Sequence, residues 1–131
     1  MAHKKIIRSF SRLSEHGSKF WESLYKKLMI KKPDTLKYFG KTDMHALYTM
    51  LSNSVTYIVL NSSSDTVQSS EYFQKVVKIH NDKLKIPKTY IWEWRNCLLQ
   101  TIQEFDSELT EAEFEIWRQA VDIIIEPIGV E

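Results

Sequence analysis

The chain has 131 residues, of which 43% are hydrophobic and 12% aromatic, and its 18 basic side chains nearly balance 17 acidic ones. That length is typical of a single domain that buries about two thirds of its unfolded surface. A formal net charge of +1 gives no electrostatic reason to expect nucleic acid or an anionic membrane as a partner. A single cysteine, Cys97, excludes an intramolecular disulfide and fits a reducing compartment. Because there is also no signal-peptide pattern and no long apolar run, we expect one soluble cytoplasmic domain over residues 1–131.

Apolar residues recur with helical spacing along almost the whole chain, so we predict an all-α protein with six to seven helices. The first two helices are expected over residues 3–15 and 18–32, with Gly17 at the break. Pro33 opens a turn, Asp43 can cap a helix that reaches residue 60, and the polar residues 61–65 form a loop. Further helices are expected over 70–83, over 87–105, and from the capping-box pair Thr110 and Glu113 to Pro127.

The helices over 18–32 and 87–105 carry apolar residues on more than one face. A simple bundle of helices would give mostly single stripes, since each helix buries one side. The wider apolar arcs indicate several neighbours or a ligand in the middle of the fold.

His80 ends an apolar stripe that also contains Phe73, Val76 and Val77 at positions i, i+3 and i+4. A titratable ring on a buried stripe costs free energy unless a hydrogen-bond partner or a metal meets it. The spacing alone therefore leaves two interpretations open, a hydrogen-bonded core histidine and a metal ligand.

The segment LYKKLMIKKPDTLKYF, residues 24–39, is the most specific motif in the chain. It resembles the pattern FYxxLFxxxPxxxxxF of bacterial single-domain globins and flavohaemoglobin haem domains. Tyr25, Leu28, Pro33 and Phe39 stand at the matching positions, and TDM, residues 42–44, resembles the start of the next helix in that group. The resemblance extends over nearly the whole chain and implies a globin fold around a haem pocket.

His80 follows Phe39 by 41 residues, and His80, Pro87 and Tyr90 match the spacing HxxxxxxPxxY of the same group. The resemblance therefore implies that His80 is the proximal ligand of the haem iron. No CxxCH motif is present, so the expected cofactor is non-covalent haem b. The residues expected to contact this cofactor, by the positions they share with the family, are Tyr25, Phe39, Leu47, Leu51, Val76, Leu84, Ile86, Tyr90 and Trp94.

Two side chains compete as the polar group on the distal side of the haem. Matching TDM to the family places Leu47 at the usual distal position and Leu51 one turn later, while His45 points about 200° away from Leu47. Tyr25 is then the expected hydrogen-bond donor to the gas ligand. The alternative for Tyr25 is a core tyrosine bonded to a backbone carbonyl, and the alternative distal group is His45.

The expected function is reversible binding of dioxygen or another diatomic gas, as a carrier, store or sensor, without enzymatic activity. The alternatives are nitric-oxide dioxygenation with a separate reductase, and a globin-like interaction module without haem. Three departures from the family limit how far its function can be carried over, and the third weakens the enzymatic alternative. Leu47 replaces a distal glutamine or histidine, Trp94 replaces a glycine, and the last helix lacks the glutamate that would orient the proximal imidazole. The sequence does not distinguish a monomer from a homodimer.

Overall fold

The structure is a computed structural model that describes residues 2–35, 44–62 and 70–131. These residues form helices joined by short connections, and their only β-type pairing is an isolated bridge between Pro87 and Val130. The elements, in chain order, are α1 (Ala2–Ser14), α2 (Ser18–Lys31), the 3-10 turn η1 (Pro33–Thr35), α4 (Met44–Leu60), α5 (Glu71–Lys78), the π-helical turn η3 (Ile79–Lys83), α6 (Lys88–Phe105) and α7 (Glu111–Ile125). The predicted all-α architecture is confirmed.

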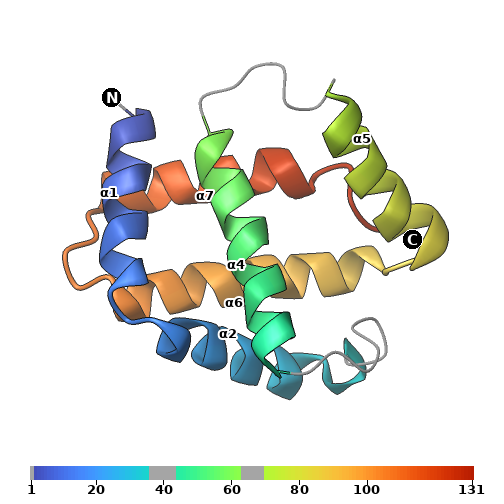
Figure 1. Ribbon diagram of the computed structural model, residues 1–131, viewed down its shortest axis with the longest axis horizontal. Helices are drawn as coiled ribbons and strands as arrows, with labels where there is room; N and C mark the ends of the chain where they lie inside the picture. Colours follow the sequence, from blue (N-terminus) through green and yellow to red (C-terminus); the bar gives the residue numbers. More distant parts are fainter. Residues whose placement is uncertain (1, 36–43, 63–69) are drawn as a thin grey trace.

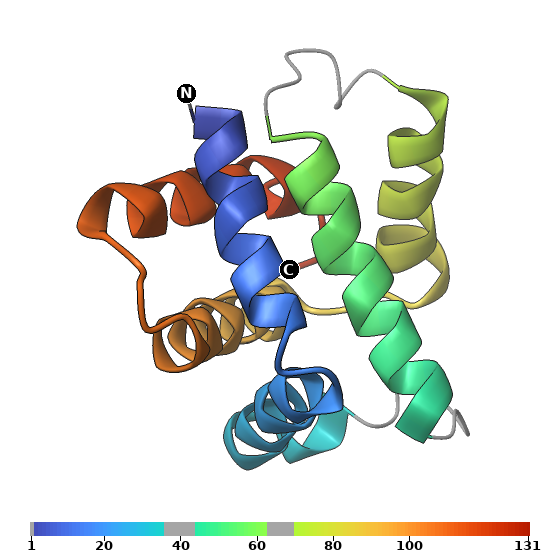
Figure 2. The same ribbon diagram turned by 60° about the vertical axis from the view of Figure 1, so that its left-hand side comes forward.

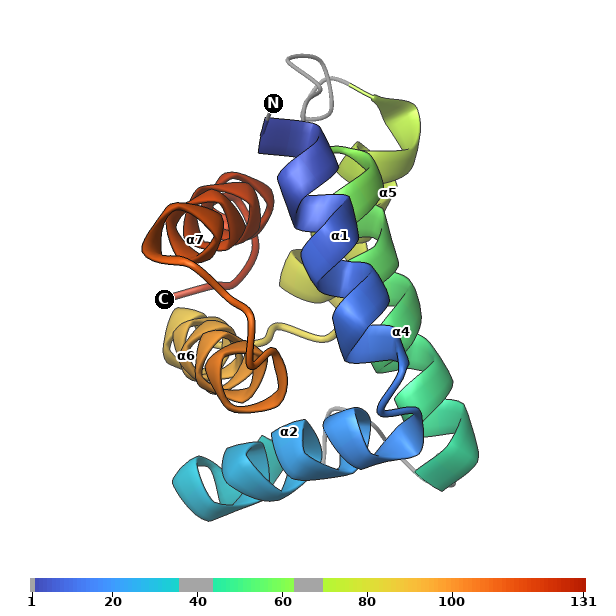
Figure 3. The same ribbon diagram turned by 90° about the vertical axis from the view of Figure 1, so that its left-hand side faces the viewer.

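The helices are stacked in two crossing layers. Helices α1 and α4 lie side by side and cross in front of α6 and α7, which are antiparallel to each other (Figure 1). The side view shows α1, α4 and α5 on one side of the molecule and α6 and α7 on the other, with α2 running beneath both (Figure 3). Helix α5 lies at the margin of its layer, beside α4 (Figure 2).

The main hydrophobic core lies where these layers meet. Ile6 of α1, Leu24 of α2, Val55 of α4, Leu98 of α6 and Trp117 of α7 have no exposed surface. Each of these helices therefore presents at least one apolar stripe to the centre, as the helical spacing predicts.

The predicted helix boundaries agree with the structure to within about two residues. Gly17 separates α1 from α2 with φ of +58°, a left-handed conformation that favours glycine. The capping box that opens α7 is present, because Thr110 accepts from the Glu113 backbone N–H and the Glu113 carboxylate accepts from that of Thr110. The helix predicted over 70–83 is α-helical only as far as Lys78 and continues as the π-helical turn η3.

A buried polar network ties the end of α6 to α1 and α7. Asp106 accepts hydrogen bonds from Ser9 Oγ at 2.6 Å and from Arg12 Nε and Nη2 at 2.6 and 2.8 Å. Arg12 also reaches the Glu113 carboxylate at 3.1 Å, and the indole N–H of Trp117 donates to Ser9 at 2.8 Å. This network fixes the corner between α6 and α7 against the first helix.

In the described part of the chain, no helix is both long enough and apolar enough to span a membrane.

Candidate functional site

His80 lies in the π-helical turn that follows α5. The backbone N–H of Leu84 donates to the carbonyl of Ile79 at 3.0 Å, and that of Ile86 donates to the carbonyl of His80 at 3.1 Å. Lys85 turns the chain away with φ of +51°, a conformation that is uncommon for a residue with a side chain. Single π-helical turns are rare in proteins, and many of those that occur lie at functional sites.

A backbone carbonyl fixes the orientation of the His80 ring. The Nδ1 atom lies 2.7 Å from the carbonyl oxygen of Val76, one turn earlier in α5. A carbonyl can only accept, so this contact requires a proton on Nδ1, and in the neutral ring Nε2 then carries the lone pair. Metal-binding histidines almost always donate their second ring N–H in this way. The hydrogen-bond partner that the core interpretation requires is thus present, and it also prepares the ring to bind a metal.

Ring contacts between α4 and α5 place His80 level with the first half of α4. Tyr57 of α4 lies 6.2 Å from Phe73 of α5 in a stacked arrangement, and the two helices run in opposite directions (Figure 1). His80 follows Phe73 by seven residues and Leu51 precedes Tyr57 by six, so both lie about 10 Å along their helices from this contact.

The first half of α4 buries two of the predicted distal residues. Leu47 and Leu51 are buried, but they do not belong to the main core cluster that contains Val55 from the second half of the helix. His45 is exposed on α4, which agrees with its predicted direction away from Leu47. The second half of α4 therefore packs into the main core, whereas Leu47 and Leu51 in its first half are buried outside that core.

Tyr25 of α2 is half-buried, and α2 packs against α4, which carries Tyr48. Burial, with smaller contributions from Glu22 and Tyr25, raises the pKa of Tyr48. Tyr25 therefore lies on a helix that packs against α4, and its distal role stays a prediction.

The other predicted contact residues lie in varied environments. Val76, Ile86, Tyr90 and Trp94 are half-buried, and Leu84 exposes 40% of its surface. Phe39 lies outside the described residues. Trp94 packs against the main core, and the Tyr90 hydroxyl lies 3.5 Å from an Asp34 carboxylate oxygen with Lys32 over its ring.

His80 is a single potential metal ligand, which suits a cofactor that supplies the other ligands of its metal itself. The described residues contain no group of three or more His, Cys, Asp or Glu side chains that could hold a metal ion. A haem needs only one neutral imidazole from the protein, because the porphyrin supplies four nitrogen ligands. His80, with Nδ1 occupied and Nε2 unprotonated, fits that requirement.

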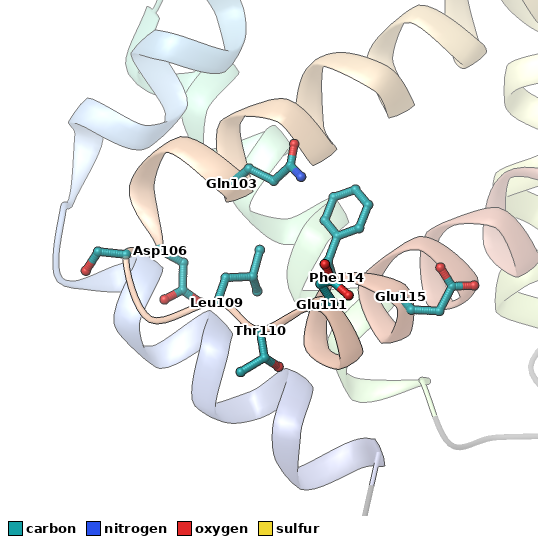
Figure 4. A pocket seen from close by; sticks show the side chains of 8 residues that line it. Gln103, Asp106, Leu109, Thr110, Glu111, Phe114 and Glu115 are labelled. Carbon is teal, nitrogen blue, oxygen red and sulfur yellow. The ribbon is translucent and has the colours of Figure 1, made fainter.

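Two surface hollows elsewhere do not fit this cofactor. The larger, about 480 Å³, lies where α6 ends and α7 begins, and its lining includes Asp106, Glu111 and Glu115 (Figure 4). Acidic groups would repel haem propionates, and no histidine lines it. The smaller, about 210 Å³, lies between α1 and α2 near Phe10, Trp21 and Ser52, and also lacks a histidine.

An all-α chain with a half-buried imidazole whose Nδ1 is bonded to a backbone carbonyl suits an all-α haem protein. The globin family model matches residues 22–128, so the chain belongs to the globin family. Membership implies haem binding in general. The crystal structure of a Pseudomonas aeruginosa PAO1 protein, PA3967, described as structurally highly homologous to a human hemoglobin, superposes with a TM-score of 0.79. It is 19% identical and the match covers 99% of this chain and 100% of that one, which shows the shared fold. No curated protein matches the sequence significantly.

Sequence periodicity does not reveal the residues that hold the His80 turn against the end of the chain. Asn81 bonds to Pro127 and Gly129, and Lys88 bonds to carbonyls at the end of α7. Asn81, next to His80, and Gly129 carry no periodic signal. Only the tertiary structure therefore reveals that they are bonded to each other.

Proposed function

We propose that this globin reversibly binds dioxygen through a five-coordinate haem b, with His80 as the proximal ligand and Tyr25 as the distal donor. The observation that supports it best is the hydrogen bond between His80 Nδ1 and the Val76 carbonyl, since it leaves Nε2 unprotonated. The only cysteine, Cys97, is buried in the main core, which favours a non-covalently held cofactor. Reversible binding of a gas to the haem iron would serve a carrier, a store or a sensor in the cytoplasm equally.

The proximal side would act through a single side chain. The Val76 carbonyl would hold the neutral imidazole in one tautomer, with Nε2 available to the iron. Leu84, exposed beside this turn, supplies an apolar surface that a porphyrin would cover. Ferrous haem, when bound, would supply an open coordination position for dioxygen or another diatomic gas.

The distal side would combine one hydrogen-bond donor with two apolar side chains. The phenol of Tyr25 would donate to the gas ligand, and such a bond in a dry pocket contributes about 1 kcal/mol. Leu47 and Leu51 are buried and apolar, so they would exclude water. A distal side of this kind favours ligand retention over turnover, and we therefore propose a binding protein rather than an enzyme.

Absorption spectra of the purified protein with added haemin test this proposal. The wild type should show the spectrum of b-type haem, and His80→Ala should lose it. His45→Ala is the matched control, because His45 is an exposed histidine on the opposite helix and its loss should leave the spectrum unchanged. A protein that takes up no haemin, or a His80→Ala variant with the wild-type spectrum, would overturn the proposal.

Dissociation of dioxygen tests the role of Tyr25. In Tyr25→Phe the rate should rise about fivefold, the equivalent of one lost hydrogen bond. Tyr48→Phe removes a neighbouring phenol on α4 and should leave the rate near that of the wild type. Equal rates in Tyr25→Phe and the wild type would exclude Tyr25 as the donor. Sustained nitrate formation from nitric oxide in the presence of a cellular reductase would instead support the dioxygenase alternative.

A further inference from the structure

We infer that the C-terminal strap, residues 127–130, positions the iron ligand, and that Asn81 is the positioning residue that connects the two. This inference rests on the proposed role of His80. In the ribbon view the strap leaves α7 and runs towards the turn that follows α5 (Figure 1). The Asn81 side chain uses both of its polar atoms on the strap. Its Nδ2 donates to the carbonyl of Pro127 at 2.9 Å, and its Oδ1 accepts from the backbone N–H of Gly129 at 2.7 Å.

The backbone of the strap continues this connection on the other side of the turn. Val130 N–H donates to the Ile86 carbonyl at 2.8 Å, and Lys88 N–H donates to the Val130 carbonyl at 2.7 Å, forming a short parallel bridge. The Ile86 N–H in turn donates to the carbonyl of His80. The strap therefore holds the His80 turn through the next residue, Asn81, and through the main chain at Ile86.

The strap is itself fixed to the body of the protein. Gly129 has φ of +104°, and a Cβ there would lie 3.0 Å from the Lys88 Cα and 3.1 Å from the Ile91 Cγ1. Only glycine fits this position. The Lys88 ammonium donates to the carbonyls of Ile128 at 2.8 Å and Glu126, where α7 ends. The side chain of Ile128 is buried in the main core.

The helix that carries His80 has little other anchorage near the ligand. In α5 and η3, Phe73 is the only buried side chain, and it lies seven residues before His80. Val77, three residues before His80, is partly buried and packs against the core. Because Phe73 and Val77 both precede the turn, the hydrogen bonds to the strap are needed to fix where the His80 turn lies relative to α6 and α7.

Removing the Asn81 amide should therefore loosen the iron ligand without removing it. In Asn81→Ala we expect haem to dissociate about tenfold faster than in the wild type, at the lower end of the effect of groups that orient metal ligands. The resonance Raman band of the iron–histidine stretch should shift or broaden. Asn81→Asp keeps an acceptor for the Gly129 N–H but loses the donor to Pro127, so it should fall between Asn81→Ala and the wild type.

Arg95→Met is the matched control. Like Asn81→Ala it removes two hydrogen bonds between elements, but these join α6 to α7 and lie away from the strap. Arg95 donates to both carboxylate oxygens of Asp122, at 2.8 and 3.1 Å. It should lower the overall stability but leave the iron–histidine band in place. Hydrogen exchange of the haem-free protein gives a second measurement, in which Asn81→Ala should accelerate exchange of the Leu84 and Ile86 amides about tenfold and Arg95→Met should not.

The outcomes separate this inference from the proposed function. If the wild type binds haem through His80 but Asn81→Ala matches Arg95→Met in dissociation rate, Raman band and exchange, the strap has no positioning role. A wild type that takes up no haem overturns both. A graded effect from wild type through Asn81→Asp to Asn81→Ala, absent from Arg95→Met, supports the inference.

Discussion

Asp106 shows how much a single buried side chain can contribute to this fold. It is 3% exposed, yet it accepts from Ser9, from both Arg12 nitrogens and from the backbone N–H of Glu108. In Asp106→Asn the charge is lost and the amide can satisfy only some of these donors. Breaking a largely buried ion pair leaves its partner without compensation, so we expect the free energy of unfolding to fall by about 2 kcal/mol. Urea unfolding followed by circular dichroism measures this loss.

Glu115→Gln provides the comparison at the surface. Glu115 pairs with Arg118 on the exposed side of α7, where water screens the interaction. The same change from acid to amide should therefore have little effect on the unfolding midpoint. Equal losses in the two variants would mean that the Asp106 network contributes no more than an exposed ion pair.

At the scale of single helices, much of the fold can be predicted from the sequence. The helix spacing of Phe114, Trp117, Val121 and Ile124 predicts α7, and the pair Thr110 and Glu113 predicts its first turn. Both signals are local, because a cap joins residues three apart and a stripe repeats every turn. The same spacing predicts His80 at the end of an apolar stripe, whereas in the structure His80 lies just past the end of α5, in η3.

The contacts between distant residues could not be predicted in this way. The bond from Ser9 to Asp106 spans 97 residues, and the bond from Asn81 to Gly129 spans 48. The π-helical turn at His80 depends on such contacts rather than on periodicity. His16 is a further case, because its Nε2 lies 2.8 Å from the carbonyl oxygen of Phe105, 89 residues away in the sequence. The predicted contact residue Phe39 lies outside the described residues, so its role stays a prediction.

The capping box of α7 can be tested as an element. Thr110→Ala removes the side-chain acceptor for the Glu113 backbone N–H and should lower the free energy of unfolding by about 1 kcal/mol. Thr110→Ser keeps the hydroxyl and should remain close to the wild type. Thermal unfolding of the two variants checks the difference, and a Thr110→Ser variant as unstable as Thr110→Ala would show that the methyl group, rather than the cap, matters.

At the scale of the whole molecule, two distant polar connections hold the C-terminal helix. At its start, the network of Asp106 and Glu113 joins α7 to α1 and α6. At its end, the strap joins α7 to the His80 turn. Helix α7 therefore links the corner that stabilises the fold to the turn that presents the proposed ligand. Changes at the first connection should alter global stability, whereas changes at the second should alter the His80 turn.

The first connection also predicts how the protein responds to acid. Burial would raise the pKa of Asp106 and Glu113, but hydrogen bonds outweigh it, chiefly from Arg12 to Asp106 and from Thr110 and Arg12 to Glu113, and hold both pKa values below their usual range. Carboxylates with a lowered folded-state pKa stabilise the protein above the unfolded pKa values, 3.8 and 4.5 here, and lose that contribution as pH falls towards the lower folded values. Wild-type stability should therefore fall steeply below about pH 4.5. Asp106→Asn should show a shallower fall, because one of the two groups no longer titrates. Urea midpoints measured from neutral pH downwards compare the slopes, and the same slope in both proteins would show that Asp106 does not control acid unfolding.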